Sequence, residues 1–309
     1  MREILRHLLT SPIPSEPIGS VPAWWARHRA ATAGFSRPID RAIAGGFSAD
    51  RLGYAFASGY HAALRALVPG LRDDELAALC VTEQRGAHPR AIEATLRPEG
   101  VRHYRLSGHK RWATLSTFAD VLLVVATVGT DDAGIHRLRV AKVGARQPGV
   151  VIRPMPETPF APEIPHAEVH LTDVAIAPDD LLPGDGYDLY VKPFRTLEDT
   201  HVHAALLGYV LGVARRYGWP PAIQQEALAL LGLLCAISTE PPGAPETHLV
   251  LGGAIDLTGQ LLEKTRAHWS AAGDEERDRW QRDAGLLQVA SGARAQRLEA
   301  AWRNLQEPR

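Results

Sequence analysis

The run Val121-Leu-Leu-Val-Val-Ala-Thr-Val128 decides the fold class, because an uninterrupted series of β-branched and apolar residues is typical of a buried strand. Other strand-like runs lie on both sides of it, each bounded by Gly, Pro or Asp: ALCVT (78–82), HYRLSG (103–108), HRLRVAKV (136–143), GVVIRPM (149–155) and AEVHLTDVAI (167–176). No helix of useful length fits between these runs, and parallel strands need long crossovers. The sequence therefore predicts an antiparallel β-barrel, or a sandwich, over residues 79–187.

Helical periodicity is found on both sides of this β domain. Residues 1–78 form a predicted N-terminal helical segment, with one long buried helix over 49–68 that ends at Pro69-Gly70. Residues 188–309 form the third predicted domain, a C-terminal four-helix bundle with members at 194–216, 221–237, 246–269 and 274–305. The expected fold class is α+β and multidomain: helices, a β-barrel, then a bundle.

The composition excludes several classes of protein. With 34 basic and 35 acidic side chains among 309 residues, the net charge of -1 argues against binding nucleic acid or anionic membranes by bulk charge. The two cysteines, Cys80 and Cys235, lie far apart in apolar runs and indicate neither a disulfide framework nor a zinc site. No long apolar run or signal-peptide pattern is found. We expect a soluble cytoplasmic protein with no nucleic-acid or membrane partner.

Four motifs occur in order within the β domain. They are Val81-Thr-Glu-Gln-Arg-Gly-Ala-His-Pro89, Tyr104-Arg-Leu-Ser-Gly-His-Lys-Arg-Trp-Ala-Thr114, Ala119-Asp-Val-Leu-Leu-Val-Val-Ala126 and Glu168-Val-His-Leu-Thr-Asp-Val174. In order and spacing they resemble the middle domain of the acyl-CoA dehydrogenase family, whose architecture is also helices, a barrel and a bundle. The resemblance implies FAD, an acyl thioester substrate with CoA as the expected carrier, an electron-transfer partner, a role in lipid metabolism, and a homodimer or homotetramer, with a hetero-oligomer as the alternative.

The resemblance also implies residues that contact the flavin. Thr82, Trp112 and Thr114 match family positions that line the isoalloxazine ring, where hydroxyl and backbone groups can hydrogen-bond the ring edge while the indole covers a face. The alternative is that Trp112 is a half-buried barrel aromatic and that both threonines are ordinary strand residues.

Other phosphate and substrate positions are implied in the same way. His88 stands where the family has a small Ser that meets a phosphate or the acyl-CoA, and Arg85 could bind a phosphate bidentately or be a solvated loop residue. Arg215 and Arg216 match an arginine that reaches the FAD pyrophosphate of a neighbouring subunit; the alternative is a helix C-terminal arginine that offsets the dipole. Leu251-Gly-Gly253 is the nearest match to the family's Gly-Gly-rich segment.

Dehydrogenation of a thioester requires a carboxylate base that takes the α-proton. Most of the family places this Glu near the C-terminus, at the position of Ser291 here, and a serine cannot be that base. A minority places it on the first helix of the bundle, where Glu198 falls. Glu198 is therefore the predicted catalytic base, and the alternative is a solvated first-turn glutamate.

A metal site near Glu198 is the less favoured interpretation. Glu198 with His201, and Asp199 with His203, are pairs at helical spacing, but a di-iron bundle needs a second Glu-x-x-His, which the bundle lacks. No metal is predicted.

Three functions are consistent with the sequence. The first is an FAD-dependent acyl-CoA dehydrogenase-like oxidoreductase that transfers a hydride to flavin N5. The second is a non-catalytic or partner subunit of a heteromeric acyl-CoA dehydrogenase that has lost part of its cofactor site. The third is a flavin-dependent monooxygenase on the same scaffold, which needs no carboxylate base.

Overall fold

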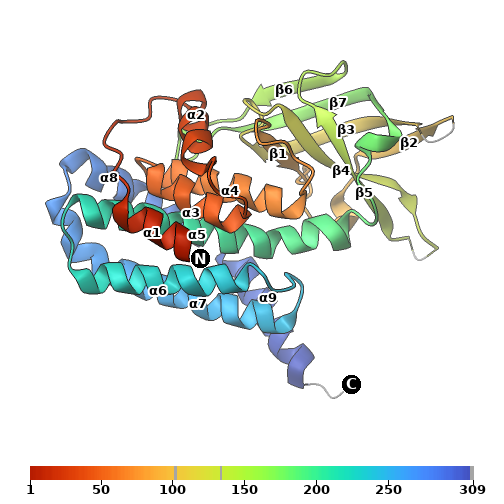
Figure 1. Cartoon of the computed structure of the whole chain (residues 1–309). Coiled ribbons are helices and arrows are strands. Elements are labelled where there is room, and N and C mark those ends of the chain that lie inside the picture. Colours follow the sequence, from red (N-terminus) through yellow and green to blue (C-terminus); the bar gives the residue numbers. More distant parts are fainter. Residues whose placement is uncertain (101–102, 133, 307–309) are drawn as a thin grey trace. The chain divides into compact units, whose positions relative to one another are not determined.

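The computed structural model describes residues 1–100, 103–132 and 134–306 (Figure 1). These residues form two compact units. The β unit contains Leu67–Glu157 and Ile164–Phe194, and the helical unit contains Met1–Ala66, Thr158–Glu163 and the chain from Arg195 onward. The N-terminal and C-terminal helices thus share one unit, while the predicted limits at 78/79 and 187/188 stay predictions.

In the β unit, seven strands form one sheet within the described residues: β1 (Ala77–Cys80), β2 (Thr95–Glu99), β3 (His103–Thr114), β4 (Val121–Thr130), β5 (His136–Gly144), β6 (Val150–Pro154) and β7 (His166–Ile176). The strand order is β1-β4-β2-β3-β7-β6, and β5 pairs with β4. Figure 1 shows the sheet as a curled half-barrel. Every predicted run overlaps a strand. The sequence missed β2, whose Pro98 and charged neighbours interrupt the alternating pattern.

The prediction of an antiparallel barrel is not confirmed, because the sheet is mixed and its strand order is open. Strand β1 pairs in parallel with β4, with Ala77 opposite Val121, whereas β3–β7, β4–β5 and β6–β7 are antiparallel. A parallel pair needs a long crossover, and here β2 and β3 themselves form the connection from β1 to β4. The crossover is therefore made of strands and not of a helix, which is why the sequence did not predict it.

A buried ion pair lies inside the sheet. Lys110 on β3 is fully buried, and its Nζ lies 2.6 Å from Oε1 of Glu83 and 3.3 Å from the carbonyl oxygen of Val81. The Glu83 carboxylate also accepts hydrogen bonds from the backbone N–H groups of Glu93 and Ala94, at 2.7 and 3.0 Å. Burial lowers the pKa of Lys110, and the charge of Glu83 opposes that shift. This pair attaches the turn after β1 to the centre of β3.

The helical unit begins with α1 (Arg2–Thr10), α2 (Val21–Thr32), α3 (Pro38–Ser48) and α4 (Leu52–Leu67). The predicted helix over 49–68 is α4, and 12 of its residues are buried. After the β unit follow α5 (Lys192–Arg216), α6 (Pro221–Ile237) and α7 (Pro245–Thr265). Among the described residues, no helix combines the length and hydropathy that a bilayer crossing requires.

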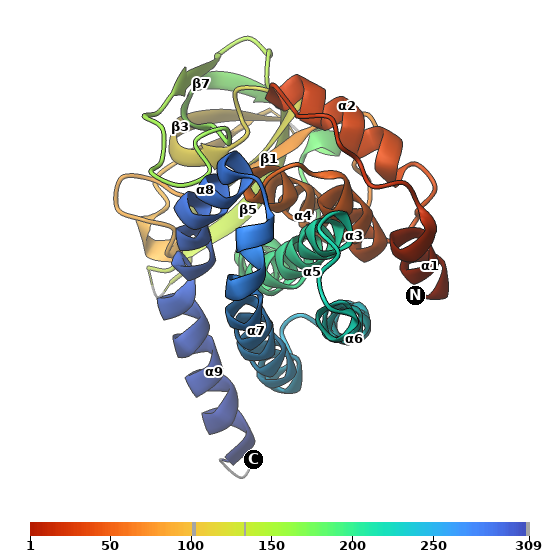
Figure 2. The same cartoon turned by 90° about the vertical axis from the view of Figure 1, so that its left-hand side faces the viewer.

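A four-helix bundle is not confirmed, because the predicted fourth member over 274–305 is broken. It consists of α8 (Asp274–Asp283), a short 3₁₀ segment (Ala284–Gln288) and α9 (Ser291–Gln306). At the break, the fully buried carboxylate of Asp283 accepts the backbone N–H of Ala161 at 2.7 Å and pairs with Arg282. Helix α7 lies between α6 and α9 and packs against both (Figure 2).

Close contact between α3 and α5 depends on a glycine. A Cβ added at Gly46 would overlap the backbone of Ala205, including its carbonyl oxygen. A backbone carbonyl cannot turn away as a flexible side chain can, so only glycine fits at this crossing.

Replacing Gly46 with alanine should destabilise the protein by about 2 kcal/mol or more, because the added methyl group would push the two helices apart. The measurement is thermal and urea unfolding followed by circular dichroism. Gly34→Ala is the control, since a Cβ there meets no atom within 4 Å. Equal melting curves for both variants would contradict the assigned crossing.

Removing the charge of Lys110 should be costly, because Glu83 would remain buried without its cation. We expect Lys110→Met to lower the free energy of unfolding by about 3–5 kcal/mol, and the double variant Lys110→Met/Glu83→Gln to recover part of the loss. Lys264→Met removes an exposed ion pair with Glu226 and should cost about 1 kcal/mol or less. A double-mutant cycle in urea measures the coupling, and a loss at Lys110 as small as that at Lys264 would disprove it.

Candidate functional site

The predicted flavin-contacting residues of the β unit lie on or beside β3. Trp112 and Thr114 are among the last three residues of β3. The carbonyl oxygen of Thr82 accepts a hydrogen bond from the backbone N–H of Arg111 at 2.8 Å. Thr82 is therefore next to the Trp112 segment. The Glu83–Lys110 pair, which involves the residue after Thr82, holds the two segments together.

Trp112 is presented outward by an irregularity in β3. The register with β7 shifts between Lys110 and Ala113, and Trp112 has a φ of 56°, an uncommon backbone conformation for a bulky residue. Such bulges turn a side chain out of the strand's regular alternation. The indole is 49% exposed, and it makes an edge-on ring contact with His166, at 5.8 Å between centroids.

The two threonines are available for hydrogen bonding. Thr82 and Thr114 are partly exposed, and neither hydroxyl makes a hydrogen bond to another of the residues that the structure describes. A flat exposed indole with two free hydroxyls nearby suits a planar ligand that has polar edges, such as an isoalloxazine ring. The residues present thus fit the implied flavin.

Arg85 and His88 lie in the exposed loop that follows Glu83. Arg85 is 3.7 Å from the carboxylate of Glu93. His88 caps the short 3₁₀ turn Pro89–Ala91, where its Nδ1 accepts the N–H of Arg90 at 3.3 Å. His88 thus has a local structural role, while the substrate role of both residues stays a prediction.

Glu198 lies on α5 in the helical unit. The helix begins at Lys192, so Glu198 is its seventh residue and is beyond the first turn, where the dipole would favour a charge. Its carboxylate is half-buried and accepts no hydrogen bond within the described part of the chain. Burial and the neighbouring charge of Asp199 raise the pKa of Glu198 to about 7, although nearby arginines oppose the shift.

The neighbour Asp199 anchors α9 to α5. Its two carboxylate oxygens face Arg294 Nε, at 2.9 Å, and Arg297 Nη2. All three side chains are largely buried. Neither arginine was predicted from the sequence. Their spacing of three residues on the last helix was the available signal, because it places them on one helix face.

The metal alternative near Glu198 finds no support in the side-chain contacts. His201 Nδ1 lies 2.7 Å from the carbonyl oxygen of Leu197, and His203 Nδ1 lies 2.7 Å from that of Asp199. Burial lowers the pKa of His201 to about 4 and also lowers that of His203. Within the described residues, these groups form no cluster with metal-ligand spacing.

Arg215 and Arg216 are both engaged inside the helical unit. Arg215 donates to the carbonyl oxygens of Leu8 and Ser11, at the C-terminal end of α1. Arg216 pairs with Glu276 at 2.9 Å and donates to the carbonyl of Pro14 at 2.7 Å. Their predicted binding of pyrophosphate would require them to exchange these contacts for a phosphate.

A cavity of about 760 Å³ lies among the helices of the helical unit. Its walls include His203 of α5, Gly252 of α7 and, from α9, Ser291 and Arg294. Ser291, at the position where most of the family has its base, therefore lines a cavity and supplies a hydroxyl. Glu198 is not among the described residues that line it.

Comparison with known proteins agrees with this architecture. Residues 78–174 match the family described as acyl-CoA dehydrogenase, middle domain. No curated protein sequence matches the chain significantly.

Solved structures match over nearly the whole chain. The prolyl acyl carrier protein oxidase AnaB is 16% identical with a TM-score of 0.69, covering 99% of this chain and 97% of its own. Butyryl-CoA dehydrogenase from Megasphaera elsdenii is 15% identical with a TM-score of 0.69, covering 94% and 91%. The FAD complex of PigA is 15% identical with a TM-score of 0.67, covering 98% and 92%.

The family match covers the β unit from β1 to β7, and the structural matches extend the same fold to the helices on both sides. Residues 78–174 thus match the acyl-CoA dehydrogenase middle domain, and the solved structures share the fold of nearly the whole chain.

Proposed function

We propose that the protein is a flavin-dependent dehydrogenase that introduces an α,β double bond into an acyl thioester. The observation that carries the proposal is the unbonded, half-buried carboxylate of Glu198, whose pKa is raised to about 7. A general base is most effective when its pKa is near the working pH. We further propose FAD as the flavin and CoA as the carrier of the acyl group.

Trp112, Thr82 and Thr114 would hold the flavin in this proposal. The exposed indole of Trp112 would cover one face of the ring, and the free hydroxyls of the threonines would bond its polar edge. When bound, the flavin supplies a hydride acceptor. The rigid Glu83–Lys110 pair supports this arrangement, because it prevents the Thr82 turn from moving away from β3.

Glu198 would remove the α-proton of the thioester. The Asp199–Arg294–Arg297 cluster fixes the adjacent turn of α5, so the carboxylate is positioned by the helix and not by a flexible loop. Arg85 and His88 would contact the carrier's phosphates, and Arg215 and Arg216 the cofactor's pyrophosphate. A homo-oligomer and an electron-transfer partner complete the proposal.

One observation favours a second candidate, a partner subunit without full activity. Both arginines expected to meet the pyrophosphate already bind carbonyl groups of their own chain, and Arg216 also pairs with Glu276. A chain that has exchanged cofactor contacts for internal ones would keep the fold and lose the flavin.

The two candidates differ in whether the purified protein binds flavin and is reduced by substrate. We expect yellow protein, or uptake of FAD by colourless protein, and anaerobic bleaching by one or more members of an acyl-CoA panel. Glu198→Gln should retain the flavin and slow bleaching by about a hundredfold or more. Glu299→Gln, an exposed carboxylate on α9, is the control.

Protein that binds neither FAD nor FMN would contradict dehydrogenation and favour the partner subunit. Flavin that is bound but bleached equally fast in Glu198→Gln would exclude Glu198 as the base. Bound flavin that no thioester reduces, but that oxygenates another substrate, would indicate a monooxygenase.

The raised pKa of Glu198 also predicts a dependence of stability on pH. The carboxyl is protonated in both the folded and the unfolded chain below its ordinary value of 4.5, so it costs nothing there. As the pH rises towards about 7, only the unfolded chain ionises freely, and the folded state loses stability. The free energy of unfolding of the wild type, relative to Glu198→Gln, should therefore fall between these pH values. Parallel urea titrations measure it, and a constant difference would contradict the shift.

A further inference from the structure

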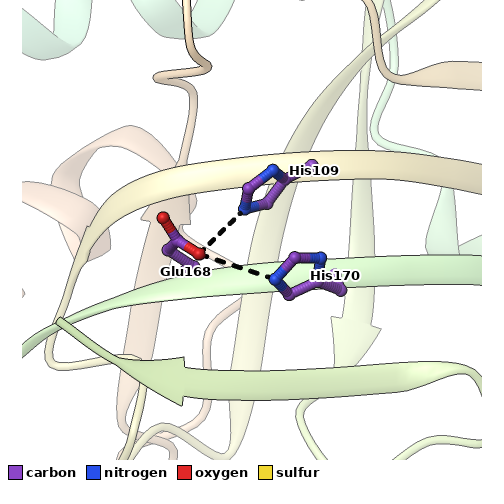
Figure 3. A group of neighbouring side chains, drawn as sticks. All are labelled: His109, Glu168 and His170. Carbon is purple, nitrogen blue, oxygen red and sulfur yellow. Dashed lines mark ion pairs between the residues drawn. The ribbon is translucent and has the colours of Figure 1, made fainter.

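Three side chains with metal-ligand chemistry meet on one face of the sheet. Strands β3 and β7 are antiparallel, and His109 lies directly opposite His170. Glu168 precedes His170 by two residues, so alternation places both on the same face of β7. Val169, which lies between Glu168 and His170, and Lys110, which follows His109, are fully buried on the other face. Figure 3 shows both imidazoles directed at the Glu168 carboxylate.

The spacing of the three groups suits a small divalent ion. His109 Nε2 and His170 Nε2 lie 3.3 and 3.6 Å from the same oxygen, Oε2 of Glu168. One donor atom from each residue lies within 4.8 Å of the others. A tetrahedral zinc ion with bonds of about 2.0–2.1 Å requires donor atoms about 3.3–3.4 Å apart. The two rings are stacked with their centroids 4.0 Å apart, so both rings must tilt out of the stack to direct their lone pairs at one ion.

The two ring nitrogens approach Glu168 without forming a well-aligned hydrogen bond. His109 Nε2 and His170 Nε2 are shielded from solvent, yet neither makes a geometrically acceptable hydrogen bond to any described residue. Shielded polar atoms that make no hydrogen bond are uncommon in proteins and require an explanation. A cation bound between the two nitrogens and Oε2 of Glu168 would give all three atoms a partner.

The other carboxylate oxygen is held from outside the cluster. Arg111 Nε lies 3.0 Å from Oε1 of Glu168, which leaves Oε2 turned towards the imidazoles. Such an outer contact orients a ligating carboxylate. Arg153, opposite Glu168 on β6, adds a second positive charge nearby. We therefore expect moderate affinity, since two guanidinium groups oppose a cation.

We propose that His109, Glu168 and His170 form a binding site for a divalent transition-metal ion such as zinc, with the fourth position left to water or an anion. Two imidazoles and one carboxylate are a ligand set that zinc accepts, and three protein ligands leave one position open. The site is independent of the flavin and of Glu198, so it stands or falls separately from the proposed dehydrogenation.

The test is calorimetric titration of ZnCl₂ into the full-length protein after treatment with chelator. We expect one zinc ion per chain with a Kd on the order of micromolar, weakened by about tenfold or more in His170→Ala and in Glu168→Gln. His103→Ala, an exposed histidine on the same strand, is the matched control and should bind as the wild type does.

A second readout is the visible absorption of added Co²⁺, which is intense only in a tetrahedral site. We expect these bands in the wild type and in His103→Ala and their loss in Glu168→Gln. This nearly isosteric variant should fold even if an alanine variant does not, and circular dichroism checks each one. Absence of stoichiometric zinc binding, or equal binding by the wild type and Glu168→Gln, would overturn the proposal.

Discussion

The Glu83–Lys110 ion pair is the interaction on which the β unit depends. A lysine with no exposed surface can keep its charge only beside an anion, and Glu83 is the anion that supplies it, at 2.6 Å. Because the same carboxylate also accepts two backbone N–H groups, it ties three segments together: the turn after β1, the start of β2, and β3. An apolar pair could fill the same space in several arrangements, whereas the ion pair requires the turn after β1 to lie against β3.

This constraint sets up the chemistry of the outer surface of the sheet. With Lys110 directed inward, strand alternation directs His109 and Arg111 outward, and the bulge that follows turns Trp112 into the open. The indole proposed to meet the flavin and the imidazole proposed to bind a metal ion are thus neighbours of one buried lysine. The buried charge of Lys110 therefore fixes the orientation of both the proposed flavin-contacting indole and the proposed metal-binding imidazole.

The helical unit also contains a buried carboxylate that is balanced by cations, at Asp199. Asp199 is buried and balanced by two arginines of α9, while the adjacent Glu198 is left without a hydrogen-bond donor among the described residues. Two neighbouring carboxyls on one helix therefore differ in surroundings. The paired one holds the helices together, and the unpaired one has its pKa raised to about 7 and can accept a proton near neutral pH.

The sequence by itself determined most of the element types, the order of helices, strands and helices, and the likeness of the β unit to the acyl-CoA dehydrogenase middle domain. These depend on periodicity and on short motifs, such as the run at 121–128 and the segment around Lys110 and Trp112. Such patterns can be recognised without knowing the long-range contacts. The sequence could not determine the parallel pairing of β1 with β4 or the break after Asp283, because both depend on partners many residues away. The candidate site residues divide in the same way between what the sequence predicts and what only the structure shows. Local motifs predicted roles for Thr82, Trp112 and Glu198. Only the tertiary structure brought Arg294 and Arg297 to Asp199, and His109 to Glu168 and His170. An ion pair between helices or a cluster across strands depends on distance in space and not on spacing along the chain.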